Sequence, residues 1–222
     1  MARYDATVLV SGGIESVVMA HHLVTVEKKS IRAIHFSLGS PSAHYQLHHA
    51  KKILNAIGAP LDVVNMSGLV EMTAGYVDPG WAAMDEGDEE WSLPIGPDKR
   101  LSFLPTLIAT SVYHANITSS PVVYVGYSKE QARQGIIDFM NSIGSCVSLV
   151  HRNEPPVQVS APFISYTKSD VIALGTRNGL NVSDTWSCYY DGPVQCGTCA
   201  ACTQRKNAFQ AAQIADSTIY KK

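Results

Sequence analysis

The first 65 residues alternate short apolar runs with amphipathic segments, a pattern that few fold classes can accommodate. Three apolar runs predict strands, and two segments with apolar residues at helical spacing predict the helices between them. The strands are expected at residues 6–10, 31–36 and 61–65, and the helices at 16–27 and 44–57. Parallel strands need helical crossovers to return to the same edge. The opening therefore predicts an α/β fold, a doubly wound parallel sheet that binds ligands at the carboxyl ends of its strands.

The rest of the chain adds two strands to this sheet, for five in all, and ends in a segment without the strand–helix alternation. Further strands are expected at 122–126 and 157–160, and helices at 101–115, 136–143 and 167–179. The last of these helices begins with a capping box, Thr167-x-x-Asp170, and ends at Gly179. Residues 66–100 interrupt the alternation and are interpreted as an insertion or long loop. We expect one α/β domain over 1–180 and a small C-terminal lobe over 181–222.

Composition narrows the classes of protein further. Hydrophobic residues make up 45% of the 222 residues and charged residues 16%, which excludes intrinsic disorder. A formal net charge of −2 provides no basic field, so direct nucleic-acid binding is not expected. No apolar run approaches the roughly 18 residues that span a bilayer. We therefore expect neither a signal peptide nor an anchor, and a cytoplasmic location.

Ser11-Gly12-Gly13 lies between the first predicted strand and the first predicted helix. A helix N-terminus directs free N–H groups and a positive dipole end toward one point, which favours phosphate. The two glycines allow close approach of the backbone, and Ser11 and Ser16 add hydroxyl donors. Neither GxxxxGK[ST] nor GxGxxG fits here, and a plain strand-to-helix turn is the alternative. Glu15 would repel phosphate unless a divalent cation lay between them, which predicts Mg²⁺ bound with a nucleotide.

Four of the five cysteines lie close together near the C-terminus, at Cys188, Cys196, Cys199 and Cys202. Their spacing favours tetrahedral Zn²⁺ with four thiolate ligands, and such a closed site would be structural. Two disulfides, a redox relay, buried thiols without metal and an iron–sulfur cluster are the alternatives. Cys199 and Cys202 are expected at the start of the final helix, and Arg205, on the same helix face as Cys202, is predicted to offset part of the thiolate charge. Loss of the metal is expected to unfold this lobe before it affects the chemistry.

Two motifs together resemble a known family. SGGIES resembles the SGGxDS loop of the N-type ATP pyrophosphatases, the PP-loop superfamily with the adenine nucleotide alpha hydrolase-like fold, and Glu15 replaces the aspartate of that loop. The segment from Thr185-Trp186-Ser187-Cys188-Tyr189 through Cys196-Gly197-x-Cys199-x-x-Cys202-x-x-Arg205 to Ala208-Phe209 is similar to the end of the QueC family. The match therefore covers nearly the whole chain.

The resemblance implies an ATP-dependent ligase. In QueC-like enzymes, ATP activates 7-carboxy-7-deazaguanine as an acyl adenylate with release of pyrophosphate. Ammonia then displaces AMP to give the amide, and a second ATP drives dehydration to 7-cyano-7-deazaguanine, a step of queuosine biosynthesis. The resemblance also implies a homodimer, with ATP, Mg²⁺ and structural Zn²⁺ as cofactors.

The resemblance also assigns roles to individual residues. Nucleotide contacts are implied for the loop and for two further positions, namely Ser11, Gly12, Gly13, Ile14, Ser16, Arg100 and Thr167. Catalytic roles are implied for Glu15, which would hold Mg²⁺ or orient a metal-bound water, for Lys168, which would neutralise phosphate charge, and for Arg133. An exposed lysine at the helix start and surface arginines are the alternatives for Lys168, Arg100 and Arg133.

Several family elements are replaced, which leaves the activated substrate open. Ser37-Leu38-Gly39-Ser40 stands where the family has Asp-Tyr-Gly-Gln, Leu101 replaces an asparagine, and Gln131-Ala132 replaces Asp-Cys. A diverged QueC-like enzyme that stops at the amide, or that transfers the deazaguanine acyl group to an amine of a protein or other macromolecule, is therefore the main alternative. tRNA thiolation and a non-catalytic, zinc-stabilised nucleotide-binding protein are further alternatives; the lack of a basic patch counts against the former.

Overall fold

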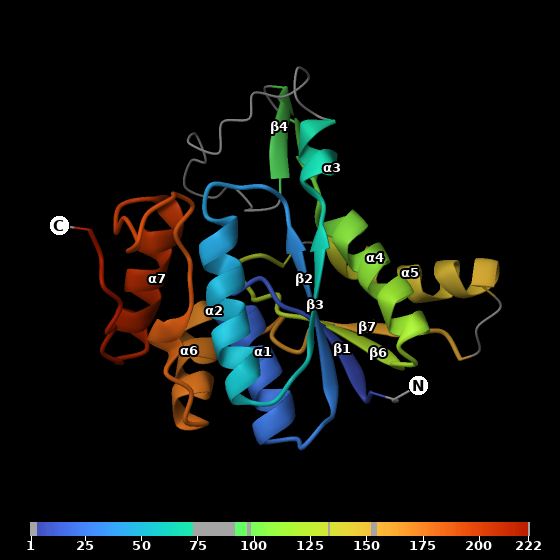
Figure 1. Cartoon of the computed structure of the whole chain (residues 1–222), viewed down its shortest axis with the longest axis horizontal. Helices are drawn as coiled ribbons and strands as arrows, with labels where there is room; N and C mark the ends of the chain where they lie inside the picture. The colour runs from blue at the N-terminus through green and yellow to red at the C-terminus, as the bar shows by residue number, and fades with distance from the viewer. Residues whose placement is uncertain (1–3, 73–91, 97–98, 133, 152–154, 222) are drawn as a thin grey trace.

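The computed structural model describes residues 4–72, 92–96, 99–132, 134–151 and 155–221. Five parallel strands form its main sheet in the order β3-β2-β1-β6-β7 (Figure 1). They are β1 (Ala6–Leu9), β2 (Ile31–Ser37), β3 (Leu61–Asn65), β6 (Val122–Val125) and β7 (Gln158–Ser160). The predicted doubly wound, five-stranded parallel sheet is confirmed.

The centre of this sheet positions the site. Strand β1 lies between β2, which follows it in the chain, and β6, which comes much later. The strand order therefore reverses at β1, and the crevice at its carboxyl end is where open α/β sheets bind ligands. Residues Ser11-Gly12-Gly13 follow β1 at this point.

Helices cover both faces of the sheet. On one face, α1 (Ile14–Thr25) packs against both α2 (Ala43–Ala56) and α6 (Lys168–Arg177), and Figure 1 shows the three helices on the same side of the sheet. Helix α1 is buried on almost every side, because it is enclosed by the sheet and by these two helices. The other face carries α4 (Leu104–Ile117) and α5 (Gln134–His151), which pack on β6 and β7.

The helix predicted at residues 101–115 begins later than expected. Helix α4 begins at Leu104 rather than at Leu101, because Pro105 is accommodated only in the first turn of a helix. The residues just before it form β5 (Lys99–Ser102), which pairs antiparallel with β4 (Ser92–Gly96). A short helix, α3 (Ser67–Glu71), follows β3. The acidic residues between 85 and 90 lie outside the described residues.

The C-terminal lobe packs against the sheet domain. It contains a short 3₁₀ turn (Val182–Asp184) and α7 (Ala200–Ala211), which lies against α6 (Figure 1). Ala208 and Phe209 of α7 join the same apolar core as Val171 and Ile172 of α6. None of the described helices has the length and apolar character needed to cross a membrane.

Candidate active site and metal centre

The bend after β1 requires glycine at its centre. Gly12 has φ +94°, a conformation that L-residues rarely adopt. A Cβ at this position would lie 2.2 Å from the carbonyl oxygen of Gln46 on α2. No other residue fits here unless α2 moves. Gly12 therefore shapes the bend through its backbone.

The start of α1 presents donors at this bend. Gly13 is the N-cap residue, and no side chain caps the helix. The first intrahelical bond runs from the N–H of Val17 to the carbonyl of Gly13, so the amides of Ile14, Glu15 and Ser16 precede the hydrogen-bonded ladder. Together with the positive end of the helix dipole, these amides form a site suited to an anion.

Two hydroxyl groups add to this set of donors. The Oγ atoms of Ser11 and Ser16 lie 3.0 Å apart, and Ser16 Oγ accepts the N–H of Ser11 over 3.1 Å. Gly13 donates its N–H to Ser11 Oγ over 3.2 Å. The four predicted residues that line this bend, Ser11, Gly13, Ile14 and Ser16, are therefore brought together as expected. Gly126, at the end of β6, closes the bend from the other side, since a Cβ there would lie 2.6 Å from the Ser16 nitrogen.

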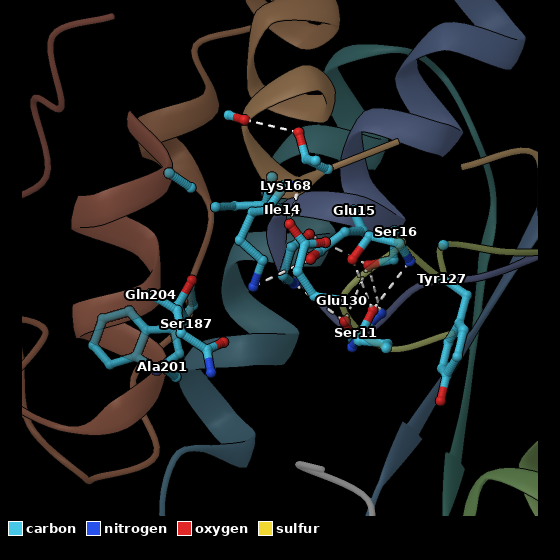
Figure 2. Close-up of a pocket in the computed structure, with 18 of the residues that line it drawn as sticks. Ser11, Ile14, Glu15, Ser16, Tyr127, Glu130, Lys168, Ser187, Ala201 and Gln204 are labelled. Carbon is cyan, nitrogen blue, oxygen red and sulfur yellow. Dashed lines mark hydrogen bonds and ion pairs between the residues drawn. The ribbon is translucent and has the colours of Figure 1, made fainter. Parts of the chain in front are cut away.

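Lys168 and Glu15 form an ion pair beside the bend. The Lys168 Nζ atom lies 3.2 Å from Glu15 Oε1, and both side chains are largely buried (Figure 2). The buried Oε1 atom accepts no hydrogen bond from the described residues. A carboxylate oxygen that faces a cavity with one cation as its neighbour is a suitable ligand for Mg²⁺, which binds through one or two carboxylates and substrate phosphates. Glu15 therefore fits the predicted divalent cation.

The capping box of α6 fixes the place of Lys168. Thr167 Oγ1 accepts the N–H of Asp170, and the Asp170 carboxylate accepts the N–H of Thr167 over 2.9 Å, as the sequence predicts. Hydrogen bonds from Thr167 lower the pKa of Asp170. The N–H of Lys168 donates to Glu130 Oε1 over 2.9 Å. Sequence reasoning missed Glu130, because no motif distinguishes it from a surface acid.

These groups line one cavity of about 530 Å³. Its walls come from the loop after β1, the first turn of α1, the end of β6, the start of α6 and, unexpectedly, the C-terminal lobe. Thr167 and Lys168 line it beside Glu15, as their predicted roles require. Arg133 and the side chain of Arg100, in β5, lie outside the described residues. The predictions for these two arginines therefore remain predictions.

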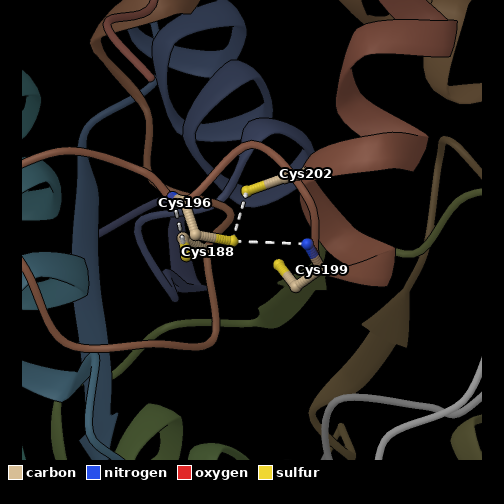
Figure 3. A group of neighbouring side chains, drawn as sticks. All are labelled: Cys188, Cys196, Cys199 and Cys202. Carbon is tan, nitrogen blue, oxygen red and sulfur yellow. Dashed lines mark hydrogen bonds between the residues drawn. The ribbon is translucent and has the colours of Figure 1, made fainter. Parts of the chain in front are cut away.

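The four thiols of the C-terminal lobe converge. The sulfur atoms of Cys188, Cys196, Cys199 and Cys202 all lie within 4.8 Å of one another, and the four cysteines are free of disulfides (Figure 3). Tetrahedral Zn²⁺ with bonds of about 2.3 Å separates its sulfur ligands by roughly 3.8 Å. The measured Cys196–Cys202 sulfur distance is 3.9 Å. The cluster therefore fits a metal ion, and no disulfide joins these four cysteines in the structure.

The backbone around the cluster favours thiolates. Cys199 is the N-cap residue of α7 and Cys202 lies in its first turn, as expected. Cys196 Sγ accepts the N–H groups of Thr198 and Cys199, and Cys188 Sγ accepts the N–H of Cys196. Such N–H to sulfur bonds stabilise the charge that metal ligation requires.

Arg205 does more than the sequence predicts, because it interacts electrostatically with Cys202 and also holds the preceding loop. It is fully buried, and its five hydrogen bonds with described residues all go to oxygen atoms rather than to sulfur. Its guanidinium binds Thr185, Ser187 and the Val182 carbonyl ahead of the first ligand, and Thr218 beyond α7. Burial lowers its pKa. Arg205 therefore holds the loop that leads into the cluster.

Trp186 connects the four-cysteine cluster to the glycine bend after β1. Its backbone N–H donates to the carbonyl of Gly12 over 2.9 Å, and its indole N–H donates to the carbonyl of Cys188 over 2.9 Å. Its ring stacks on Tyr45 with centroids 4.6 Å apart. One buried residue thus contacts the bend, α2 and the first metal ligand.

Comparison with known proteins gives the family. A family model described as "Queuosine biosynthesis protein QueC" matches residues 5–213. The chain belongs to the QueC family. It is 26% identical to the 7-cyano-7-deazaguanine synthase of Paracoccus denitrificans, over 96% of this chain and 92% of that protein. The protein of the same name from Methanothrix thermoacetophila is 28% identical, over 97% and 98% of the two chains.

Solved structures confirm the fold of this QueC family member. NMN synthetase from Francisella tularensis superposes with a TM-score of 0.54 at 12% identity, over 95% of this chain and 78% of that one. The U34-tRNA thiolase NcsA from Methanococcus maripaludis, solved with its [4Fe-4S] cluster, gives 0.51 at 15% identity over 94% and 64%. At these identities the likeness concerns the PP-loop fold alone.

Proposed function

We propose that this QueC family protein is an ATP-dependent ligase that adenylates 7-carboxy-7-deazaguanine and converts it with ammonia, through the amide, to 7-cyano-7-deazaguanine. The observation that supports this most strongly is the Lys168–Glu15 ion pair beside an uncapped helix N-terminus, in one cavity at the carboxyl end of β1. A cation, a carboxylate and free amides converge there, as a nucleotide triphosphate and its metal require.

In this proposal, the bend holds the pyrophosphate that leaves. The first-turn amides of α1 and the Ser11 and Ser16 hydroxyls donate to its oxygens, and Thr167 lies at the same wall of the cavity. Lys168 exchanges its contact with Glu15 for the phosphate charge that develops as the α–β bond breaks. Glu15 is then free to hold Mg²⁺, which would screen the phosphates when bound.

The proposed reaction needs no covalent enzyme intermediate. A carboxylate oxygen of the substrate attacks the α phosphorus, pyrophosphate leaves, and ammonia then displaces AMP from the acyl carbon to give the amide. The amide oxygen attacks a second ATP in the same way, and its departure with AMP, together with loss of the two amide protons, leaves the nitrile. The contribution of the chain is to hold the reacting groups together and away from bulk water. The four-cysteine cluster is proposed to hold a structural zinc ion within a C-terminal lobe over 181–222, next to the PP-loop domain over 1–180. Arg100 and Arg133 are proposed as further phosphate contacts.

One feature of the cavity favours a second candidate. Gln131, which replaces an element of the family, lines the cavity, and its Oε1 accepts hydrogen bonds from the N–H and hydroxyl of Ser128. An altered wall beside the reacting groups is consistent with a diverged enzyme that stops at the amide or passes the acyl group to an amine of a protein or other macromolecule.

The test is a product assay. The purified protein is incubated with ATP, Mg²⁺, ammonium and 7-carboxy-7-deazaguanine, and nucleotides and substrate mass are analysed together. The proposal predicts AMP, pyrophosphate and the nitrile mass. The amide mass, or AMP release that depends on an added protein amine, would support the second candidate. ADP, or no turnover with any acceptor, would contradict both.

A further inference from the structure

The cavity has a wall that the adenylation mechanism does not use. This wall is formed by one face of α7, in the lobe that carries the metal cluster. Ala201, Gln204, Ala208 and Ala211 recur there at helical spacing, with Asn207 beside them. The alanines leave room in the cavity, and the two amides are the polar groups that this face of α7 presents to it.

The two amides have no partner within the described part of the chain. Gln204 and Asn207 are exposed to the cavity, and neither forms a hydrogen bond with any residue that the structure describes. Figure 2 shows Gln204 beside Ser187 and Ala201, on the α7 side of the cluster formed by Lys168 and Glu130. By contrast, the amide of Gln131 across the cavity is bound to Ser128. The α7 amides are therefore free to bind a ligand.

The opposite side of the cavity is apolar. Leu9, Leu104, Val125 and Tyr127 line it as buried apolar side chains. Such a surface accepts the faces of a flat ring but offers few hydrogen bonds to its edge. A substrate with many donors and acceptors on its edge is accommodated better by α7. Asn and Gln each present both a donor and an acceptor, which suits an edge with a ring carbonyl beside N–H and amino groups.

We infer that Gln204 and Asn207 read the guanine-type edge of the substrate to be activated, with its carboxylate directed to Lys168. Adenine presents fewer groups on its edge and is assigned to the apolar side. This inference rests on the proposed function, because the substrate class comes from it. The four-cysteine cluster would then also help to position the substrate-selecting residues, since it anchors the start of α7.

The experiment measures binding without turnover. Calorimetric titrations with 7-carboxy-7-deazaguanine alone and with ATP alone are compared for the wild type, the double variant Gln204→Ala/Asn207→Ala, and Gln210→Ala. Gln210 is an exposed residue of the same helix that lies outside the cavity wall. Two lost neutral hydrogen bonds should weaken deazaguanine binding roughly 10- to 100-fold. ATP affinity and the control should be unaffected. Gln204→Glu, which keeps the shape but loses the donors, should also weaken deazaguanine binding.

Three results would overturn the inference. These are a wild type that does not bind the deazaguanine, a double variant that binds it normally, or a loss confined to ATP, which would assign α7 to adenine. The binding experiment requires no turnover. Tight deazaguanine binding by a protein that releases no AMP would therefore contradict the proposed function but not the inference that Gln204 and Asn207 bind the guanine-type edge. Thermal unfolding of each variant shows whether it has folded.

Discussion

Trp186 donates its backbone N–H to the carbonyl of Gly12 over 2.9 Å, across 174 residues of chain. Gly12 forms the bend at which the first-turn amides of α1 lie, and Trp186 stands two residues before Cys188, the first residue of the four-cysteine cluster. The bend and the metal cluster are therefore held together by a main-chain hydrogen bond in the protein interior. A substitution that disrupts either the bend or the four-cysteine cluster should therefore also perturb the structure of the other.

Removal of the metal should abolish nucleotide binding as well as stability. A structural zinc ion contributes on the order of 10 kcal/mol to folding, and here its lobe supplies a wall of the cavity. Because this lobe lines the cavity, we predict that unfolding of the lobe and loss of nucleotide binding occur together rather than one before the other. Chelation or Cys202→Ser should lower the melting temperature and weaken ATP binding, measured by calorimetry. Cys146→Ser, at an exposed cysteine outside the cluster, is the control. Full ATP affinity in metal-free protein would refute the coupling.

Lys168→Met should slow AMP formation without unfolding the protein. Its Nζ atom lies 3.2 Å from Glu15 in the cavity, so its loss removes the cation proposed to meet the developing phosphate charge. Loss of one such electrostatic contact typically costs about 100- to 1,000-fold in kcat. Lys51→Met, at an exposed lysine of α2, should retain wild-type rates. If Lys168→Met retained the wild-type kcat, the proposed catalytic role of Lys168 would be contradicted, and its ion pair with Glu15 would be purely structural.

Gly12→Ala should disrupt the bend. The methyl group would meet the Gln46 carbonyl at 2.2 Å, and the backbone conformation is itself unfavourable for alanine. We expect a loss of about 3 kcal/mol or more in the free energy of unfolding, measured by urea denaturation. Gly58→Ala is a matched control. Its φ is also positive, but a Cβ there meets no atom within 4 Å. It should cost about 1 kcal/mol, and equal losses for the two variants would contradict the packing argument.

The protein should lose stability in acid through Asp62. Its carboxylate pairs with Arg32 and accepts a hydrogen bond from His114, and these contacts lower its pKa from 3.8 to about 2. A carboxylate with a lowered pKa stabilises the fold above its unfolded pKa, and that stabilisation disappears as the pH falls toward the folded value. The free energy of unfolding should therefore decrease between about pH 4 and pH 2.

Asp62→Asn should flatten this part of the pH profile, while Asp191→Asn, at an exposed aspartate, should preserve it. A profile that is unchanged by the loss of the Asp62 carboxylate would assign the acid sensitivity to other groups.

The sequence predicted what depends on local pattern. The three first strands, the glycine bend, the capping box at Thr167 and the cysteine spacing all carry their signal within a few residues. The sequence did not predict the hydrogen bond from the Trp186 N–H to the Gly12 carbonyl, because a main-chain hydrogen bond requires no particular side chain. It predicted only part of the role of Arg205, since helical spacing from Cys202 does not reveal the oxygens that the loop from Val182 to Ser187 brings to the guanidinium.

The cavity wall was missed for a related reason. The small and amide residues of α7 read as an ordinary exposed helix face until α7 packs on α6 beside the bend. Likewise, the helix was expected to begin at Leu101, because the local pattern does not show that Lys99–Ser102 pairs with β4 as strand β5.

The most direct test of the account is the path of one oxygen atom. If a carboxylate oxygen attacks the α phosphorus of ATP in this cavity, substrate labelled with ¹⁸O in its carboxylate should transfer one labelled oxygen to AMP when ammonia displaces it. Mass spectrometry of the released nucleotide would show this transfer. We predict singly labelled AMP and unlabelled pyrophosphate. Label in inorganic phosphate accompanied by ADP, or AMP without label, would contradict adenylation of the substrate.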